Sequence, residues 1–329
     1  MVHSTEQESQ AQAQAQPKKV WTTLITNLSY LPGLLTLHHS LLKTQTRYPF
    51  IALYTPSFPA EGLEALKARN ITTLAVPAIQ PQSSRKYEAD PRFNETWNKL
   101  VVFSLTGFER VILLDGDMLV RRGMDELMDT PLDGAEEEDG NGNRVFAATH
   151  ACACNPMKKA HYPARWIPSN CAYTPQHSHP ESAQKTGSPV TSGVGMLNSG
   201  LLVVRPSLHA YKKIQSYLSS PSKLEQYTFP DQELLSEAFQ ERWVPLPYIY
   251  NALKTMRDEN VHGKIWRDEQ VKNVHYIFAV KPWQAELPVQ EELEAEAEKE
   301  EGDVLNRWWW EINYERQALE KERGVKDGY

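Results

Sequence analysis

The chain reads RVILLDGD at residues 110–117, where four consecutive aliphatic residues run directly into two carboxylates. A run of Val, Ile and Leu without polar alternation predicts a strand that is buried on both faces. Side chains at the carboxyl end of such a strand project into the crevice where open α/β sheets bind ligands. The stretch therefore predicts a buried sheet with a polar site, Asp115-Gly116-Asp117, at its edge.

Strand-like and helix-like segments alternate on the N-terminal side of this stretch. Runs of β-branched and apolar residues predict strands, and leucines three or four residues apart predict helices. The expected strands are residues 20–26, 50–54 and 72–76, and the expected helices are residues 33–44, 60–69 and 95–104. This alternation is typical of an α/β fold with a mostly parallel central sheet and crossover helices.

The second half of the chain continues the pattern. The expected strands or strand-like segments are residues 145–149, 200–204, 248–250 and 274–278, and the expected helices are residues 208–218 and 231–239. We therefore expect a single domain over residues 20–283. It follows a disordered Gln/Ala-rich N-terminus, residues 1–19, and precedes an acidic linker and Trp-rich helical extension, residues 284–329.

Composition and charge exclude several classes of protein. The 329 residues include 35 basic and 42 acidic side chains, for a net charge of −7 and a pI near 5.9. This balance argues against a sequence-independent nucleic-acid binder, and no apolar run approaches the roughly 20 residues of a membrane span. Residues 284–303 and 133–143 contribute −8 and −5, so the rest of the chain carries +6. A basic body suits a binder of nucleotide diphosphates.

The N-terminus and the cysteine content indicate a compartment. The first residues lack the basic start and apolar core of a signal peptide. Three cysteines are too few for a secreted disulfide scaffold, so a reducing, cytoplasmic location is expected.

Two carboxylates separated by one glycine are candidate ligands for a hard cation. Oxygen ligands at the spacing of Asp115 and Asp117 suit Mn²⁺ or Mg²⁺, which would also take phosphate oxygens. A metal ion there would act as a Lewis acid and stabilise charge on a departing diphosphate. From these residues alone, an ordinary Asp-Gly turn is the alternative.

Five motifs of this chain occur in the order found in a known enzyme family. They are Leu24-x-Thr26-Asn27-x-x-Tyr30, Asp115-Gly116-Asp117, Asn198-Ser199-Gly200, Asp231-Gln232, and His275 followed by Lys281-Pro282-Trp283. Over residues 21–283 the chain thereby resembles the family 8 glycosyltransferases, the group of glycogenin and galactinol synthase. The resemblance implies a GT-A fold, a UDP-sugar donor and transfer of a hexose to a hydroxyl group with retention of anomeric configuration.

The resemblance also implies roles for residues that bind the donor. The residues assigned to the uridine nucleotide are Leu24, Thr26, Asn27 and Tyr30, with Lys99 near the donor. Those assigned to a Mn²⁺ ion, with Mg²⁺ as the alternative, are Asp115, Asp117 and His275, with Gly116 between the carboxylates. Lys281 would contact the diphosphate, where a fixed cation stabilises the leaving group as its charge develops. Without the resemblance, simple packing of Tyr30, a solvated Lys99 and a structural His275 are the alternatives.

Two motifs are assigned by the resemblance to the transferred sugar. Asn198-Ser199-Gly200 is expected just before a strand, where short polar side chains can bind sugar hydroxyls. Asp231 and Gln232 would lie beside the anomeric carbon, where either residue could steady an oxocarbenium-like state or orient the acceptor. The implied catalytic residues are Asp231, Gln232 and Asn198. A simple turn at Asn198 and helix capping by Asp231 are the alternatives that need no ligand.

Three departures from the family pattern bear on the acceptor. Residues 252–258, which align with the self-glucosylated tyrosine of glycogenins, contain no tyrosine. Thr228 stands where glycogenins carry an aspartate, and Phe278 replaces a glycine, so the diphosphate loop is expected to differ locally. A separate small polyol or glycan acceptor, as in galactinol synthase, is therefore favoured. A glycogenin-like self-glucosylating primer and an inactive UDP-sugar-binding scaffold are the alternatives.

Two features lie outside these motifs. Residues 152–192 show no periodicity, and with His150 they hold Cys152, Cys154, Cys171, His161, His177 and His179. Either these side chains bind zinc, or reduced thiols belong to a lid over the active site. The aromatic side chains His161, Tyr162, Trp166 and Tyr173 either stack on a sugar or pack the loop.

Three consecutive tryptophans, Trp308-Trp309-Trp310, cannot all face one core on a helix. Either they dock on the domain, or at least one of them makes a homodimer or membrane-surface contact.

Overall fold

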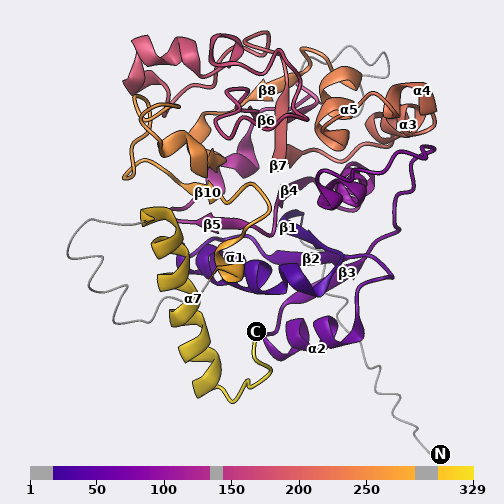
Figure 1. The fold of residues 1–329 in the computed structure, drawn as a ribbon. Coiled ribbons are helices and arrows are strands. Elements are labelled where there is room, and N and C mark those ends of the chain that lie inside the picture. The colour runs from indigo at the N-terminus through magenta and orange to yellow at the C-terminus, as the bar shows by residue number, and fades with distance from the viewer. Residues whose placement is uncertain (1–17, 134–143, 286–302) are drawn as a thin grey trace, which may run out of the picture.

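The strand predicted at residues 110–114 lies in the middle of a seven-stranded sheet. The computed structural model describes residues 18–133, 144–285 and 303–329, and the sheet has the order β3-β2-β1-β4-β7-β6-β8 (Figure 1). Its strands are β1 (Lys19–Ile25), β2 (Phe50–Tyr54), β3 (Thr72–Ala75), β4 (Arg110–Leu114), β6 (Phe146–His150), β7 (Leu197–Val204) and β8 (Trp243–Pro245). Strands β3, β2, β1 and β4 are parallel, as are β6 and β8, whereas β7 is antiparallel to β4 and β6. The predicted α/β fold with a mostly parallel sheet is confirmed.

Helices cover both faces of this sheet, because successive side chains of a strand point to opposite sides. On one face Val111 and Leu113 of β4 pack with η3 (Thr96–Ser104), α3 (Leu208–Leu218) and α5 (Pro230–Ala238). On the other face Ile112 and Leu114 pack with α1 (Leu31–Lys43) and α2 (Ala60–Ala68). A one-turn helix, α4 (Pro221–Leu224), joins α3 to α5. Burial of β4 on both faces explains its uninterrupted aliphatic sequence.

A second, three-stranded sheet brings a late segment of the chain beside the end of β4. Its strands are β5 (Met118–Val120), β9 (Ala252–Leu253) and β10 (Asn273–His275), in the order β5-β10-β9. Because β10 pairs antiparallel with β5, His275 lies opposite Met118, the residue that follows Asp117. The register of this small sheet therefore places a histidine next to two carboxylates that are distant in the sequence.

The polar triplet Asn198-Ser199-Gly200 lies inside β7, so the prediction that it precedes a strand is wrong. A polar group can be buried in a strand only where it has hydrogen-bond partners. The Asn198 side chain accepts hydrogen bonds from the backbone N–H of Gly200 and from Asn251, and Ser199 donates to Asp231. The contacts with Asn251 and Asp231, which are distant in the sequence, let the strand begin at Leu197, before the predicted residues 200–204.

Two other expected strands also differ from the structure. Residues 248–250 form a 3₁₀ helix, η8 (Tyr248–Tyr250), in which the Tyr250 N–H donates to the carbonyl of Pro247. Proline lacks a donor for a strand ladder, which favours this turn. The strand expected at residues 274–278 ends at His275, because Phe278 has a φ of 77° and the chain turns there.

The C-terminal helix α7 (Val304–Glu322) packs against α1, as Figure 1 shows. Trp309 is fully buried, Trp310 is nearly so, and the guanidinium of Arg121 lies 3.2 Å from the ring centroid of Trp308. Across the helix pair, the hydroxyl of Thr36 donates to the Asn313 side chain at 2.9 Å. The tryptophans thus dock on the domain, whereas a homodimer contact stays a prediction.

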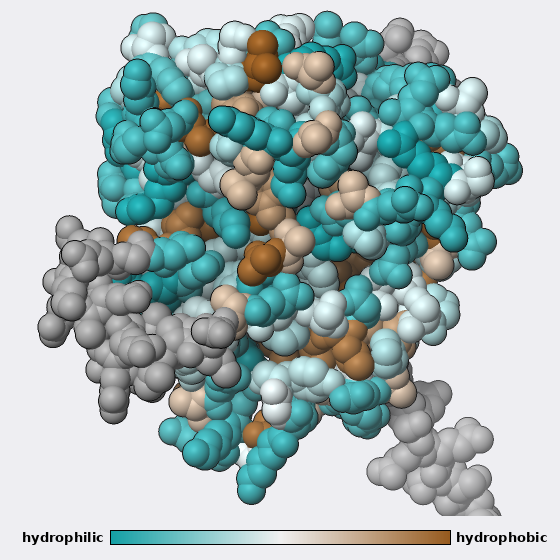
Figure 2. Space-filling model, in the orientation of Figure 1, coloured by the Kyte–Doolittle hydropathy of each residue, from teal (hydrophilic) through white to brown (hydrophobic). Residues whose placement is uncertain are grey.

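The expected disordered N-terminus and the two acidic segments fall mostly outside the described residues. Within the part of the chain that the structure describes, no helix is both long and apolar enough to cross a bilayer. The face shown in Figure 2 is mostly hydrophilic, with hydrophobic residues in small separate groups.

Candidate active site

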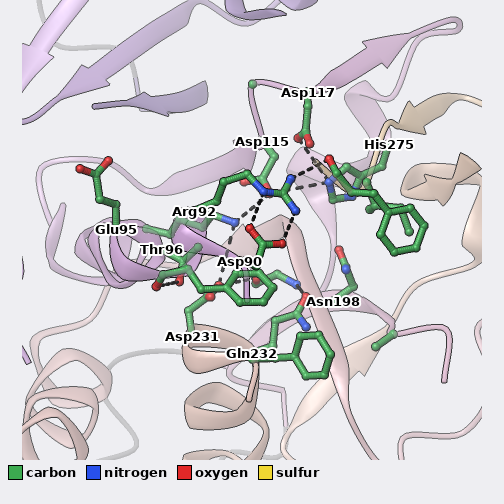
Figure 3. Close-up of a pocket in the computed structure, with 18 of the residues that line it drawn as sticks. Asp90, Arg92, Glu95, Thr96, Asp115, Asp117, Asn198, Asp231, Gln232 and His275 are labelled. Atoms are coloured by element: carbon green, nitrogen blue, oxygen red, sulfur yellow. Dashed lines mark hydrogen bonds and ion pairs between the residues drawn. The ribbon is translucent and has the colours of Figure 1, made fainter. Parts of the chain in front are cut away.

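A cavity of about 580 Å³ opens at the carboxyl ends of β1 and β4, where β4 meets the antiparallel β7 (Figure 3). The predicted site residues that line it are Leu24, Thr26, Asn27, Tyr30, Lys99, Asp115, Gly116, Asp117, Asn198, Ser199, Asp231, Gln232 and His275. Gly200 and Lys281 lie directly behind this lining. A Cβ atom at Gly200 would approach the His275 ring to 2.4 Å, so glycine permits the close contact.

Asp115, Asp117 and His275 form what we call the carboxylate cluster. Their ligand atoms all lie within 4.8 Å of one another. The Nε2 atom of His275 is 3.3 Å from a carboxylate oxygen of Asp117 and 3.8 Å from one of Asp115. Two carboxylates and an imidazole at one edge of a cavity are a donor set that fits Mn²⁺ or Mg²⁺.

Two lysines balance the negative charge of the carboxylate cluster. Lys281 is 1% exposed and donates hydrogen bonds to the Asp117 carboxylate and to the carbonyl of Tyr276. Burial alone would raise the pKa of Asp117, but the charges of Lys281 and His275 hold it well below its usual range. Burial raises the pKa of Asp115, with a further rise from Asp117, although nearby Lys99 opposes the shift. The two carboxylates thus sit in different electrostatic environments.

Lys99 lies between the carboxylate cluster and Asp231 in the cavity lining. Its Nζ atom lies 2.8 Å from Asp115 and 4.0 Å from Asp231. Burial would lower the pKa of Lys99, but these two carboxylates outweigh it and raise the pKa. The family-based expectation that this lysine lies near the donor site is consistent with its place in the cavity lining.

Asp231 and Gln232 lie in the first turn of α5, and their side chains contact Ser199 of β7 instead of capping the helix. The Ser199 hydroxyl donates to the Asp231 carboxylate, and the Ser199 N–H donates to the Gln232 side chain at 3.2 Å. Helix capping by Asp231 is therefore wrong as an explanation of this residue. The backbone N–H groups of Thr228 and Phe229 are instead bound by the Glu233 carboxylate, one turn into the helix.

Asn251 is a buried positioning residue that the sequence motifs did not include. Its amide nitrogen donates to Asn198 at 2.8 Å and to Thr149 at 3.0 Å, so its oxygen is left as the acceptor for Nδ1 of His275 at 2.9 Å. The Nδ1 proton of His275 is therefore donated to Asn251, and Nε2 is turned toward Asp117, where it could bind a metal ion. The role of Asn251 depends on contacts with residues far away in the sequence, which no local pattern indicates.

A second wall of the cavity comes from residues 90–96, of which residues 90–94 carried no motif or periodicity and residues 95–96 begin the helix expected at residues 95–104. The guanidinium of Arg92 donates to Asp90 at 2.7 Å and to the carbonyl of Phe278 at 2.7 Å, and Thr26 donates to Glu95. Burial raises the pKa of the neighbouring Tyr30 to about 12, so its hydroxyl stays protonated. Phe278 keeps the left-handed conformation that favours glycine, with its carbonyl bound by Arg92.

Aromatic side chains line the remaining side of the cavity. The rings of Trp166 and Phe229 stack with centroids 4.4 Å apart, and Tyr162 packs edge-on against Trp166. Tyr173 is buried and donates to the carbonyl of His150, so it packs the loop and does not line the cavity. His161 is exposed and is also outside the lining. Of the four side chains considered for a sugar, Tyr162 and Trp166 therefore face the site.

The sheet order, the cavity at its edge and the carboxylate cluster together define a GT-A glycosyltransferase fold. The chain matches the galactosyltransferase LgtC, solved with donor and acceptor sugar analogs, with a TM-score of 0.54 and 16% identity over 90% of this chain and 95% of LgtC. The chain belongs to glycosyl transferase family 8, whose family model matches residues 22–286. The fold and family implied by the sequence motifs are thus confirmed.

Relatives of known name support the same placement. Galactinol synthase 3 of Arabidopsis thaliana is 26% identical over 312 residues, which cover 92% of this chain and 83% of the synthase. The apo form of the glycosyltransferase GlyE of Streptococcus pneumoniae TIGR4 matches with a TM-score of 0.56 and 16% identity over 93% of this chain. The chain spans 62% of GlyE. It is thus distantly related to galactinol synthases.

Proposed function

We propose that this protein transfers a hexose from a UDP-sugar to a hydroxyl group of a separate acceptor, with Mn²⁺ and with retention of anomeric configuration. The main support for this proposal is the carboxylate cluster, whose ligand atoms converge beside buried Lys281 at the edge of the cavity. A divalent cation bound there would supply Lewis-acid stabilisation of the diphosphate leaving group. The galactinol synthases, at about the same length, suggest a small polyol such as myo-inositol as the acceptor.

The residues of the chain contribute positioning and charge. Lys281 and Lys99 are fixed cations that favour an anionic diphosphate as its charge develops. Asp231 is held by Ser199 and lies near Lys99, and both contacts make its carboxylate a weaker nucleophile. This favours front-face attack, with Asp231 and Gln232 steadying the cationic sugar, over a covalent intermediate. The stacked rings of the cavity wall would exclude water that competes with the acceptor.

Three cysteines are too few for a secreted disulfide scaffold, which supports a reducing compartment. We therefore place the activity in the cytosol.

Release of UDP from UDP-glucose, UDP-galactose and UDP-GlcNAc, each with and without Mn²⁺, tests the donor. The same reactions with myo-inositol and a panel of other polyols and glycans test the acceptor, and NMR of the product reads its anomeric configuration. We expect Mn²⁺-dependent UDP release that rises when the acceptor is added. Binding of UDP with Mn²⁺ but no turnover of any donor would instead indicate a scaffold. Mass added to the protein itself by UDP-glucose would indicate a self-glucosylating primer.

A further inference from the structure

Four buried side chains from three segments meet behind the aromatic wall of the cavity. Cys152 and Cys154 follow β6, Cys171 follows the short 3₁₀ helix η5 (Pro168–Asn170), and His262 follows η9 (Lys254–Arg257). Their ligand atoms all lie within 4.8 Å of one another. We call this group the thiol cluster. Sequence reasoning considered the cysteines but missed His262, which lies 91 residues after Cys171 and 108 residues after Cys154.

The distances within the thiol cluster match the edges of a tetrahedron around one metal ion. The Nε2 atom of His262 is 3.3 Å from the sulfur of Cys154 and 3.3 Å from that of Cys171, and the sulfurs of Cys171 and Cys152 are 4.0 Å apart. Zinc bonds of about 2.3 Å to sulfur and about 2.0 Å to nitrogen require edges of roughly 3.8 Å and 3.5 Å in a tetrahedral site. Small side-chain shifts are enough to close the coordination.

The histidine of the thiol cluster is already oriented for coordination. His262 is fully buried, and its Nδ1 atom lies 2.8 Å from Nε2 of His177. With a proton on Nδ1 shared with His177, the lone pair of Nε2 faces the two sulfurs. A hydrogen bond from the far ring nitrogen is the usual way in which proteins orient a metal-binding histidine.

Hydrophobic packing alone does not account for this grouping. The three cysteines are free and at most 9% exposed, and they converge on an imidazole rather than only on apolar side chains. Three sulfur atoms and one imidazole are soft and borderline donors, which select zinc over Mg²⁺ or Mn²⁺.

We propose that Cys152, Cys154, Cys171 and His262 bind one Zn²⁺ ion in a closed, structural site. Binding forms three Zn–S bonds and one Zn–N bond, and the three thiol protons pass to solvent. The four protein ligands leave no position open for a substrate, so the ion would not take part in the reaction.

The place of the thiol cluster shows what the ion would stabilise. Cys152 and Trp166, which lies between Cys154 and Cys171 in the sequence, line the active-site cavity. Leu253 and Thr255, on the segment that leads to His262, line it as well. Zinc would therefore hold together the two irregular segments that form this wall. The proposal does not rest on the proposed function, because zinc content can be measured without a substrate.

Metal analysis of the full-length protein, purified under reducing conditions without added metal or chelator, tests the site. We expect about one zinc per chain, lost in Cys171→Ser and retained in the matched control His179→Ala, an exposed histidine of the same loop. Asp117→Asn should also keep its zinc. A protein that holds no zinc and takes up none when Zn²⁺ is supplied would overturn the proposal, as would full zinc content in Cys171→Ser.

A second experiment covers the case in which Cys171→Ser does not fold. Cobalt supplied during expression should give the intense visible absorption of a tetrahedral thiolate site, and His262→Cys should retain the metal with a shifted spectrum. A spectrum typical of octahedral, oxygen-bound cobalt, or intact mass showing a disulfide in a metal-free protein, would contradict the site.

Discussion

The carboxylate cluster and the thiol cluster are built on the same local plan with opposite chemistry. Each begins with a pair of ligand residues, two positions apart, just after a strand: Asp115 and Asp117 after β4, and Cys152 and Cys154 after β6. Each is completed by a histidine from the later part of the chain. All three residues of the first line the cavity, whereas only Cys152 of the second does, and the second has a third cysteine. Ligand spacing after a strand thus does not define the kind of site.

What distinguishes the two clusters is how each is stabilised before a ligand binds. Carboxylates remain charged, and a buried charge needs a partner. Lys281 and Lys99 supply it, so the carboxylate cluster can stand open beside the cavity. Protonated thiols are neutral and can be buried together without a counter-ion. The difference predicts an exchangeable ion at the carboxylate cluster and a permanent one at the thiol cluster.

The largest effect is expected for Asp117→Asn. Removing one carboxylate ligand should lower Mn²⁺-dependent UDP release by at least about 10³-fold, on the order of 4 kcal/mol in the transition state. It also leaves the buried Lys281 without its anionic partner, which lowers the free energy of unfolding. Turnover assays and thermal denaturation measure the two effects.

The double variant Asp117→Asn/Lys281→Met separates these consequences. It should recover stability relative to the single variant, because no charge is left unpaired, but it should not recover turnover. Unchanged turnover in Asp117→Asn would remove the carboxylate cluster from the mechanism.

The next effect concerns stability on the side of the thiol cluster. Trp309 of α7 is fully buried in the same apolar cluster as Cys152 and Cys171. Trp309→Ala should lower the free energy of unfolding by about 3–5 kcal/mol, measured by urea denaturation. The partly exposed Trp308, which lies under Arg121, is the control, and its alanine variant should cost less. Unchanged stability in Trp309→Ala would show that α7 does not contribute to this core.

A smaller, paired effect compares the residues that orient the two histidines. Asn251 holds His275, and His177 holds His262. Loss of such a partner typically weakens metal binding 10–100-fold, or about 1.4–2.7 kcal/mol. Asn251→Ala should raise the Mn²⁺ concentration needed for half-maximal turnover and leave zinc content unchanged. His177→Ala should speed zinc loss to a chelator and leave the Mn²⁺ requirement unchanged, and crossed effects would argue against two separate sites.

The sequence predicted those parts of the site whose chemistry is local. The aliphatic run of β4 and the carboxylates that follow it are adjacent in the chain, so one stretch indicated both the sheet and the ligands. His275 was reached only through the family resemblance. Its contact with Asp117 depends on the pairing of β10 with β5, which no local pattern specifies.

Long-range polar contacts explain the rest of what sequence reasoning missed. From the sequence alone, Asn198 is predicted to be a turn residue, because its buried hydrogen-bond partner Asn251 is distant in the sequence. His262 likewise has no nearby cysteine in the sequence and joins Cys171 only in the fold. Arg92 lies in a stretch without periodicity, and its contacts with Asp90 and Phe278 follow from the folded loop.

The smallest expected effect compares one strained backbone position beside each cluster. Phe278, three residues after His275, has a φ of 77°, and Asn155, next to Cys154, has a φ of 46°. A bulky side chain is strained in this region, so Phe278→Gly should be more stable than Phe278→Ala by about 1 kcal/mol, since both remove the ring but only glycine relieves the strain. Asparagine tolerates the conformation, and its side chain accepts a hydrogen bond from the N–H of Lys159 at 2.9 Å. Asn155→Gly should therefore lower the free energy of unfolding. Urea denaturation measures both comparisons. A higher free energy of unfolding for Phe278→Ala than for Phe278→Gly would show that Phe278 stores no strain.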